Sequence, residues 1–315
     1  PMTEGTETLR FGIDLGGTKI EIIGLAVTAE KTSNTVYKKR IPTPKGDYEA
    51  TIKALKELVL EAESSLFAGA SQPLFAQPAL VGVAIPGAIS YKTGKVKNAN
   101  STWLIGQDLQ FDLALALDRP VNLANDANCF ALSEALDGSA EGADVVFGVI
   151  LGTGCGGAVV VNGHILGGVN AIAGEWGHNP LPWSSPQDIQ LPCYCGLQGC
   201  NETFLSGSGF ERHFLHRTGL EKTVQEILLL SEQNDLVAEQ LLQDYIVWLA
   251  KGLASVINIV DPDVIVLGGG LSNIQRLYTE VPKVWENWVF SDRVDTKLVP
   301  PEHGDSSGVR GAAWL

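Results

Sequence analysis

The sequence predicts an α/β protein of two lobes in which one α/β unit occurs twice. Residues 11–18 and 147–154 each carry an apolar strand into a turn of glycine and threonine, and the two segments lie 136 residues apart. The chain has 315 residues, about twice the ~150 residues of a typical domain. Two buried β-hairpins that resemble each other by chance are the alternative to a duplication, because glycine turns are common.

The first half of the sequence contains apolar patterns of both periods. The residues spaced as on one helical face are Ile52, Leu55, Leu58, Val59 and Ala62, and Asp47 stands where an N-cap is expected. The expected elements, in order, are a strand from Leu9 through the turn to Lys19, a second strand over 20–27, a helix over 47–63, a surface connection over 64–77, and a buried strand over 79–85 that ends in Pro86-Gly87.

The second half repeats this alternation. An uncharged stretch of nineteen residues, 145–163, is long enough to raise the question of a membrane helix, but its six glycines favour a buried β-hairpin. The other expected elements are a strand over 120–124, a helix over 127–136, a long helix over 236–260, and a strand over 264–267 that ends in Gly268-Gly269-Gly270.

Composition restricts the classes of partner and the compartment. Acidic residues outnumber basic ones by 36 to 22, which gives a net charge of −14 and argues against nucleic acid as the main partner. The first seven residues contain no apolar signal segment, so we expect neither secretion nor a membrane anchor. Five cysteines, of which three are close together, indicate a metal site in a reducing cytosol rather than disulfides.

The glycine turns are candidate phosphate-binding loops. Backbone N–H groups in such loops can face a polyphosphate because no side chain intervenes. The first turn adds a carboxylate that can hold Mg²⁺, a hydroxyl and an ammonium group; its residues are Asp14, Gly16, Gly17, Thr18 and Lys19. One such turn alone would favour a structural hairpin, but the turns at 152–154 and 268–270 indicate nucleotide binding.

Asn125 and Asp126 stand between a buried strand and a helix, the position at which α/β sheets bind ligands. Asp126 can accept the proton of a substrate hydroxyl while Asn125 fixes its neighbour. The alternative is that Asp126 only caps the helix beginning at Ala127, and both roles can coexist.

A third constellation has the spacing of a metal site. Fourteen residues separate His178 from Cys193, which is followed by Cys195 and Cys200. One imidazole and three thiolates complete a closed tetrahedral Zn²⁺ shell of the structural type. Glu175 and Glu202 are either ligand-binding carboxylates beside this site or supporting and surface residues. Cys129 and Cys155 are interpreted as buried small hydrophobes. The remaining histidines, at 164, 213, 216 and 303, are interpreted as surface or structural residues.

Taken together, these motifs resemble the ROK family of sugar kinases and repressors over nearly the whole chain. The segments that carry the resemblance are 14–19, 125–128, 152–154, 175–178 and the cysteine triplet. Within that family, residues 96–103, 177–183 and 303–314 look similar to the bacterial manno(fructo)kinases, the fructokinase group.

The resemblance implies an actin-like (ribonuclease H-like) ATPase fold with a lobe over 1–122, a second lobe over 123–302, and a C-terminal helix over 303–315 that packs on the first. It implies ATP and Mg²⁺ at the glycine turns, with Gly152, Thr153 and Gly154 on the phosphates and Gly268 and Gly269 on the adenosine side. It also implies Zn²⁺ at the His/Cys site and a homodimer. The residues that match the family's sugar contacts are Gly87, Asn100, Asn125, Asp126, Glu175, His178 and Glu202.

The activity implied is phosphorylation of the 6-hydroxyl of D-fructose, with mannose or glucose as further acceptors and Asp126 as general base. An N-acetylglucosamine or glucose kinase of the same family is the alternative, because one or two side chains can admit an acetyl group. A non-catalytic sugar sensor is a further alternative, although it needs neither Asp126 nor two phosphate turns. A repressor is not expected, because only thirteen residues precede Asp14 and the chain is acidic.

Overall fold

The computed structural model describes residues 7–68, 78–99 and 101–315. Within them the chain forms two compact units. The first contains the residues up to Glu141 together with 167–173 and 305–315, and the second contains 142–166 and 174–304. Two separate hydrophobic cores, one in each unit, account for this division.

The sheet of the first unit has the strand order β3-β2-β1-β4-β7. Strands β1, β2 and β3 form an antiparallel meander, whereas β4 runs parallel to β1 and β7 runs parallel to β4. The strand bounds are β1 Thr8–Leu15, β2 Lys19–Val27, β3 Ser33–Pro42, β4 Leu80–Ile85 and β7 Val121–Asn125. The parallel strands β1, β4 and β7 therefore end at one edge of the sheet.

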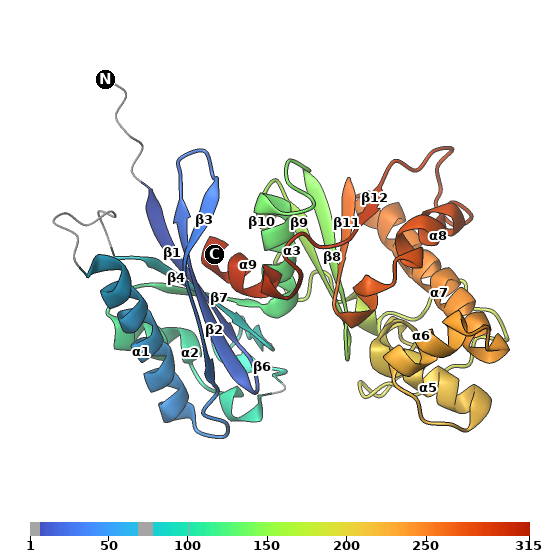
Figure 1. The fold of residues 1–315 in the computed structure, drawn as a ribbon, viewed down its shortest axis with the longest axis horizontal. Helices are drawn as coiled ribbons and strands as arrows, with labels where there is room; N and C mark the ends of the chain where they lie inside the picture. Colours follow the sequence, from blue (N-terminus) through green and yellow to red (C-terminus); the bar gives the residue numbers. More distant parts are fainter. Residues whose placement is uncertain (1–6, 69–77, 100) are drawn as a thin grey trace. The chain divides into compact units, whose positions relative to one another are not determined.

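Helices cover both faces of this sheet (Figure 1). Alternate residues of β1, from Leu9 to Leu15, are buried in one core with residues of α1 and α2, as the period of two in a strand requires. Residues of β2 that point to the other face, such as Ile23 and Leu25, pack with α9. The helix bounds are α1 Tyr48–Phe67, α2 Leu109–Leu117, α3 Asp126–Asp137 and α9 Ser307–Trp314.

Glycines allow α9 to approach the sheet and α3 closely. A Cβ atom on Gly82 of β4 would overlap the carbonyl oxygen of Ala312, and a Cβ on Gly311 would overlap the carbonyl oxygen of Cys129 in α3. The side chain of Ser307, at the start of α9, donates a hydrogen bond of 2.7 Å to the buried Glu134 of α3. The last helix is thus an integral part of the first unit.

The sheet of the second unit repeats the first in its topology, with the order β10-β9-β8-β11-β12. Again three strands form an antiparallel meander, and two more continue the sheet in parallel with β8. The bounds are β8 Val145–Leu151, β9 Cys155–Val161, β10 His164–Ile165, β11 Val264–Gly268 and β12 Lys297–Val299. The predicted duplication is confirmed, because the hairpin β1–β2 corresponds to β8–β9 in both order and direction.

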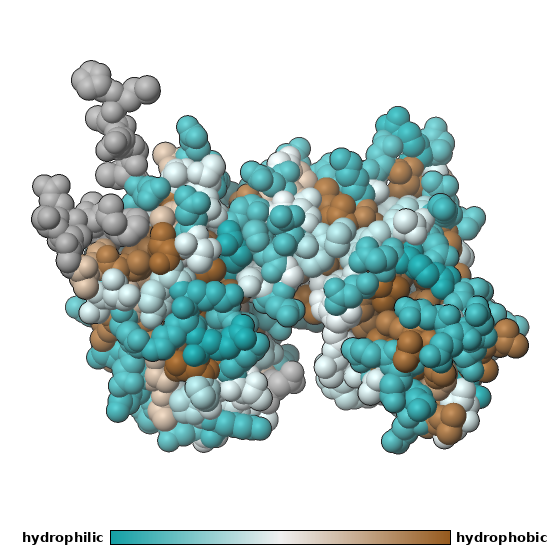
Figure 2. Space-filling view, in the orientation of Figure 1, coloured by the Kyte–Doolittle hydropathy of each residue, from teal (hydrophilic) through white to brown (hydrophobic). Residues whose placement is uncertain are grey.

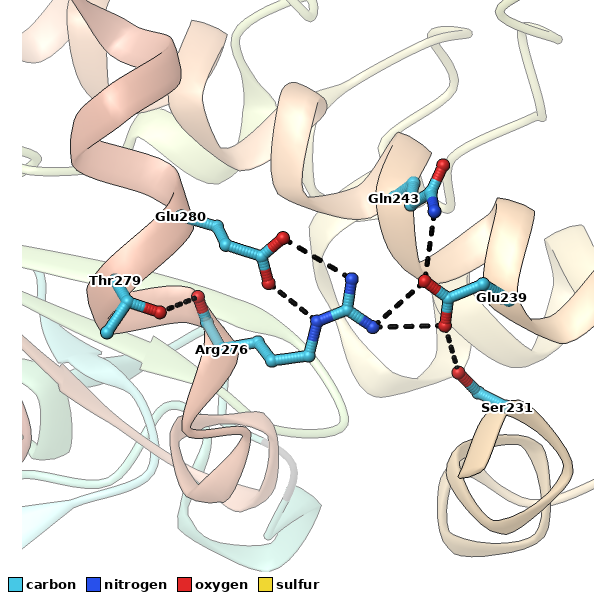
Figure 3. A network of polar contacts seen from close by, with 6 residues as sticks. All are labelled: Ser231, Glu239, Gln243, Arg276, Thr279 and Glu280. Carbon is cyan, nitrogen blue, oxygen red and sulfur yellow. Dashed lines mark hydrogen bonds and ion pairs between the residues drawn. The ribbon is translucent and has the colours of Figure 1, made fainter. Parts of the chain in front are cut away.

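The 25-residue helix α7, Leu236–Val260, is the centre of the second core, and thirteen of its residues are buried. The helices around it are α4 Asn201–Leu205, α5 Gly207–Thr218, α6 Val224–Glu232 and α8 Arg276–Trp285. Arg276 of α8 contacts Glu239 of α7 through two bonds of 3.0 Å, and Glu239 in turn accepts a bond from Ser231 of α6 (Figure 3). The side chains of Arg276 and Glu239 therefore connect α8, α7 and α6.

The short elements complete the order along the chain. Strands β5 and β6 pair with each other in a small sheet of the first unit. The bounds are β5 Ala88–Ile89, β6 Val96–Lys97, and the 3-10 helices η1 Thr102–Leu104, η2 Trp176–His178, η3 Gly270–Asn273 and η4 Gly304–Ser306.

The structure differs from the sequence expectations at two boundaries. The first unit continues to Glu141 rather than ending at residue 122, because β7 pairs with β4 and α3 packs against α9. Helix α1 continues through Phe67, into the segment expected to be a surface connection, and residues 69–77 of that segment lie outside the described residues. Asp47 caps α1 as expected, since its carboxylate accepts the N–H of Ala50 at 2.9 Å.

Hydrophilic residues are spread over the whole face drawn in Figure 2, and hydrophobic residues appear there in smaller groups, in keeping with a net charge of −14. Among the described residues, no helix combines the length and the apolar character needed to cross a bilayer. The uncharged segment 145–163 forms the hairpin β8–β9 that its glycines predict.

Candidate functional site

The first glycine turn joins β1 to β2 and is held by Thr43, which no sequence motif indicates. The N–H of Gly16 donates to the carbonyl of Lys19 at 3.0 Å, and the hydroxyl of Thr43 donates to the carbonyl of Gly16 at 2.8 Å. The N–H of Thr43 donates to the carbonyl of Thr18 at 3.0 Å. Thr43 follows β3 directly, so the meander itself brings it to the turn. Its only sequence signal is a threonine just after a strand.

Asp14 lies near the carboxyl end of β1 in a setting that disfavours its negative charge. Burial, followed by the charges of Asp126 and Glu21, raises the pKa of Asp14 to about 6. A Cβ atom on Gly308 would lie 4.0 Å from Asp14 Oδ2, so the first turn of α9 faces this carboxylate. Neighbouring carboxylates that repel each other in this way are a fitting environment for a divalent cation.

Asn125 and Asp126 occupy the junction between β7 and α3, as the sequence predicts, but their capping roles differ from the expectation. Asn125, not Asp126, is the N-cap: its Oδ1 accepts from the N–H of Ala127 at 2.8 Å and from that of Asn128 at 3.4 Å. Its Nδ2 donates to the carbonyl of Gly87 at 3.2 Å. Asp126 is the first residue of the helix, and its Oδ1 lies 2.8 Å from the N–H of Ala127.

Three of the predicted residues of the first unit therefore meet at the edge where parallel strands end. Asp14 is the last but one residue of β1, Gly87 comes two residues after β4, and Asp126 directly follows β7. This carboxyl edge is where α/β sheets bind ligands. Gly87 has no space for a side chain, because a Cβ there would lie 2.5 Å from the carbonyl of Lys97. Asn100 lies outside the described residues, but its neighbour Ser101 would be 3.6 Å from a Cβ on Gly17.

The second glycine turn, Gly152-Thr153-Gly154, is built into the second unit in a comparable way. Its carbonyls accept a bond of 2.7 Å from the N–H of Gly207 and one of 2.9 Å from the hydroxyl of Ser208, both at the start of α5. Gly269 has a φ of +80° and packs so tightly on Leu151 and Gly152 that a Cβ would lie 2.5 Å from the Leu151 carbonyl. The predicted glycines at 152–154 and 268–269 thus form one surface.

A hollow of about 410 Å³ adjoins this glycine surface in the second unit. Ser208, which bonds to the turn, is one of its lining residues. The others are Glu211, Arg212, Leu215, Glu221, Lys222, Thr223 and Glu226, from α5, α6 and the segment between them. Its volume is within the range of small-molecule sites.

Glu202 lies against the second glycine turn, which sequence spacing did not predict. Its carboxylate Oε2 accepts the N–H of Cys155 at 2.9 Å, and a Cβ on Gly154 would lie 2.9 Å from the same oxygen. Helix α4 carries Glu202 and begins directly after Cys200. One carboxylate therefore connects the glycine turn to the cysteine cluster.

The predicted metal ligands come together. One ligand atom from each of His178, Cys193, Cys195 and Cys200 can be chosen so that all four lie within 4.8 Å of one another. Cys195 Sγ and Cys200 Sγ are 3.6 Å apart, as are Cys193 Sγ and His178 Nδ1. Sulfur ligands at ~2.3 Å from a tetrahedral zinc would be about 3.8 Å apart. The donor set and its geometry therefore fit Zn²⁺.

Backbone hydrogen bonds hold the loop that carries the three cysteines. The turn 193–197 is closed by a bond of 2.8 Å from the N–H of Cys193 to the carbonyl of Leu197. A backbone N–H from Leu197 also lowers the pKa of the Cys195 thiol to about 7, which favours the thiolate form that metals bind. Isolated bridges between residues 180 and 200 and between 192 and 198 fix the two ends of the loop.

His178 is positioned by the 3-10 helix η2 and by a buried tryptophan. Trp176 donates from Nε1 to the carbonyl of Gly156 at 3.1 Å, packs edge-on against Phe147 and accepts a bond of 2.9 Å from Asn201. Since Nδ1 of His178 faces Cys193, its Nε2 is directed to the hydroxyl of Tyr194, 3.1 Å away. No motif in the sequence indicates Tyr194, an exposed residue between two cysteines.

Glu175 precedes η2 directly and lies near the same tyrosine. Partial burial, followed by the charges of Glu202, Cys193 and Glu175, raises the pKa of Tyr194. The polar side chains that gather in this part of the second unit are therefore Glu175, His178, Tyr194 and Glu202. Cys129 and Cys155 are buried outside the cluster, as expected.

The protein has two sheets of equal topology, and each begins with a glycine-turn hairpin. A carboxylate lies at the carboxyl edge of the first sheet. These features define the class of ATP-dependent sugar kinases with the actin-like fold. The chain belongs to the ROK family, whose model matches residues 10–315.

Relatives and solved structures agree with this assignment. The chain is 37% identical over 310 residues to the N-acetyl-D-glucosamine kinase of Photobacterium profundum and 38% identical over 319 residues to that of Shigella flexneri, in both cases covering 97% of this chain and 98% of the relative. The crystal structure of a ROK hexokinase from Thermus thermophilus matches with a TM-score of 0.83 at 28% identity, over 98% of this chain and 97% of that one. A ROK glucokinase from Streptomyces griseus, solved in complex with glucose and AMPPNP, matches with a TM-score of 0.71 at 26% identity, over 97% and 98% of the two chains.

Proposed function

We propose that this chain is an N-acetyl-D-glucosamine kinase, which transfers the γ-phosphoryl group of ATP to the 6-hydroxyl of that sugar. The observation that carries the proposal is the similarity, at 37–38% identity over 97% of the chain, to relatives that bear this name. The preference for fructose that we expected from the sequence has no support among these relatives. Their names support the alternative expectation, an N-acetylglucosamine kinase.

The acceptor side of the proposal is carried by the first unit. Asp126 is the proposed general base, because it stands at the carboxyl edge of the sheet at the start of α3 and a carboxylate there can take the hydroxyl proton as the phosphoryl group arrives. Asn125, fixed by the Ala127 N–H and the Gly87 carbonyl, holds this junction in place. Gly87, Asn100 and Asn125 are the proposed sugar contacts of this unit, with Asp126.

Glu175, His178 and Glu202 are the proposed sugar contacts of the second unit. Their support is that η2 and α4, which carry them, are held together by the bond from Asn201 to the carbonyl of Trp176. The exposed Tyr194 on His178 Nε2 belongs to the same polar group. Zn²⁺ at His178, Cys193, Cys195 and Cys200 would have a structural role, because four protein ligands leave no open position for substrate.

The nucleotide side is assigned to the glycine turns. Phosphoryl transfer depends on positioning and on neutralisation of charge, and N–H groups at the turns 16–18 and 152–154 would supply both. The hollow lined by Ser208, whose hydroxyl donates to the carbonyl of Thr153, is the proposed space for the rest of the nucleotide, with Gly268 and Gly269 as its proposed adenosine-side contacts. Mg²⁺ would be held by Asp14, where it neutralises phosphate charge, and Lys19 would add a second positive charge.

The experiment is an assay of ADP release with a panel of hexoses at equal concentration. We expect kcat/KM to be highest with N-acetylglucosamine. A higher value with fructose, mannose or glucose would return the assignment to the hexokinase type, which the similarity of residues 96–103 and 177–183 to manno(fructo)kinases favours. Sugar binding without any ADP release would instead identify a sugar sensor.

A further inference from the structure

The second unit contains a polar cavity of about 390 Å³ that none of the proposed catalytic residues lines. It lies between α5, α7 and the loop that precedes the cysteines. The residues around it are Ser185, Gln187, Asp188, Ile189, His213, Arg217, Asp244, Val247, Trp248 and Lys251. Three of them are basic, although the chain as a whole is acidic.

His213 is the most buried polar group of this cavity, with 2% of its surface exposed. The centre of its ring lies 5.0 Å from that of Phe204 and 4.7 Å from that of Trp248, and these two rings are themselves in contact. Burial, followed by the charges of Arg217 and Arg212, lowers the pKa of His213 to about 4, so the imidazole is neutral at pH 7. A neutral ring that donates to the backbone of Thr203 presents Nε2 as an acceptor, and this atom is buried without a partner among the described residues.

The two cations of the cavity have donors to spare. Lys251 is only 7% exposed, and its Nζ lies 3.8 Å from Asp188 Oδ2, which is beyond hydrogen-bond distance. Its charge is supported by the face of Trp288, 5.3 Å away. Arg217 uses one of its donors on Asp244 at 2.7 Å, whereas a guanidinium offers five.

The two carboxylates, in contrast, are occupied. Asp188 accepts from Trp248 Nε1 at 2.8 Å and from the N–H of Ser185 at 2.6 Å. Asp244 accepts from Arg217 and from Gln240 at 3.0 Å. The cavity therefore offers a ligand several cationic donors and one neutral acceptor, which matches an oxyanion that also carries a hydroxyl group.

The walls of the cavity adjoin the segments that carry the proposed sugar contacts. His213 packs on Phe204 and bonds to Thr203, the residues that follow Glu202 in α4. Asp188 belongs to the loop between His178 and Cys193. A ligand in the cavity would therefore contact His213, which packs on the two residues after Glu202, and on another wall it would contact the loop that leads to Cys193.

We propose that this cavity is a second ligand site that binds a phosphorylated sugar, the chemical class of the product of the proposed reaction. The phosphate would take the free donors of Lys251 and Arg217, and a sugar hydroxyl would donate to Nε2 of His213. A volume of about 390 Å³ is within the range of sites for small molecules. The identity of the ligand rests on the proposed function, whereas the site itself rests on the cavity.

The test is a calorimetric titration of the full-length chain with N-acetylglucosamine 6-phosphate. The active site is first filled with N-acetylglucosamine and a non-hydrolysable ATP analogue, so that the heat reports only the second site. We expect one binding event per chain, weakened at least tenfold in Arg217→Met and in Lys251→Met and unchanged in Arg293→Met, an exposed arginine of the same unit. Inorganic phosphate should bind more weakly than the sugar phosphate, and His213→Phe should abolish that difference.

Absence of the event, equal affinity in Arg217→Met and the parent chain, or equal affinity for inorganic phosphate would each overturn the proposal. Circular dichroism and metal content check that the variants fold, and Arg217, at the edge of the cavity, carries the test if Lys251→Met does not fold. Because the titration does not measure turnover, its outcome is separate from that of the sugar assay. If another hexose is the substrate, its 6-phosphate is the titrant.

Discussion

The backbone N–H of Cys155 donates a hydrogen bond to the carboxylate of Glu202 over 2.9 Å. This bond joins the end of the glycine turn 152–154 to α4, the helix that begins after the last cysteine of the metal cluster. It places one candidate sugar contact directly against a candidate phosphate loop. The hydrogen bond needs an acceptor oxygen but not a negative charge. Substitution can therefore separate the acceptor role of Glu202 from the role of its charge.

We expect Glu202→Gln to retain the fold and Glu202→Ala to lose stability. The amide oxygen of glutamine can still accept from Cys155, whereas alanine leaves a buried donor unpaired, at a cost of about 1–3 kcal/mol. Urea denaturation measures this difference. KM for the sugar should rise in both variants if the carboxylate binds it. A glutamine variant as unstable as the alanine variant would contradict the role of the hydrogen bond.

Asp126→Asn should reduce kcat by about 10²–10⁴-fold, the usual contribution of a general base, with little change in the binding of sugar. The helix should be unaffected, because Asn125 is the N-cap and accepts from Ala127 and Asn128. Steady-state kinetics and the urea midpoint measure the two effects. Near-normal turnover in a folded variant would remove Asp126 from the role of base.

The raised pKa of Asp14 predicts a stability that depends on pH. Its pKa is about 6 in the folded chain, against an ordinary value of 3.8, so the folded state binds more protons than the unfolded state between these two pH values. The free energy of unfolding should therefore fall as pH rises from about 4 to 6, by at most about 3 kcal/mol. Asp14→Asn should be more stable than the parent chain at pH 7 and should lose this advantage below pH 4. Equal urea midpoints at pH 7 would contradict the assignment.

Metal analysis should find one zinc per chain. Removal by a chelator should lower the melting temperature and raise KM for the sugar, because His178, Cys193, Cys195 and Cys200 lie together and α4 follows the last of them. Cys195→Ser should lose the metal. Cys129→Ala, a change at a buried cysteine outside the cluster, should keep it. A folded, active chain without zinc would refute the four-ligand site.

Two glycines of α9 provide a matched pair for its packing. Gly311→Ala places a Cβ against the carbonyl of Cys129 and should cost about 1–3 kcal/mol. Gly308→Ala meets its nearest atom, Asp14 Oδ2, at 4.0 Å and should be neutral or gain about 0.5–1 kcal/mol from helix propensity. Thermal unfolding compares the two variants. Equal effects would show that the contact with α3 does not restrict position 311.

The sequence predicted those parts of the molecule that local pattern determines. The similarity of segments 11–18 and 147–154 indicated two related hairpins, and the spacing of the cysteines indicated a cluster. Both features depend on residues that are close together in the sequence. The boundary near residue 122 was placed too early, since the pairing of β7 with β4 joins residues far apart in the sequence. Two hydrogen bonds could not be predicted for the same reason: the one from the Thr43 hydroxyl to the Gly16 carbonyl, and the one from the Cys155 N–H to the Glu202 carboxylate.

The N-cap shows a subtler limit. Asn125 and Asp126 are both good capping residues, and the pattern of the sequence does not say at which of them the helix begins. In the folded chain Asn125 is the N-cap, and its side chain also donates a hydrogen bond to the carbonyl of Gly87, which follows the end of β4.

The position of α9 has a consequence for the order in which the protein acquires its structure during synthesis. Gly82 and the carbonyl of Cys129 are made early by the ribosome, yet they are covered by residues 311 and 312. The nascent first sheet must wait, with this face bare, until residues 311 and 312 have been translated. A message truncated before the codon for residue 311 would therefore damage a sheet that had been translated long before.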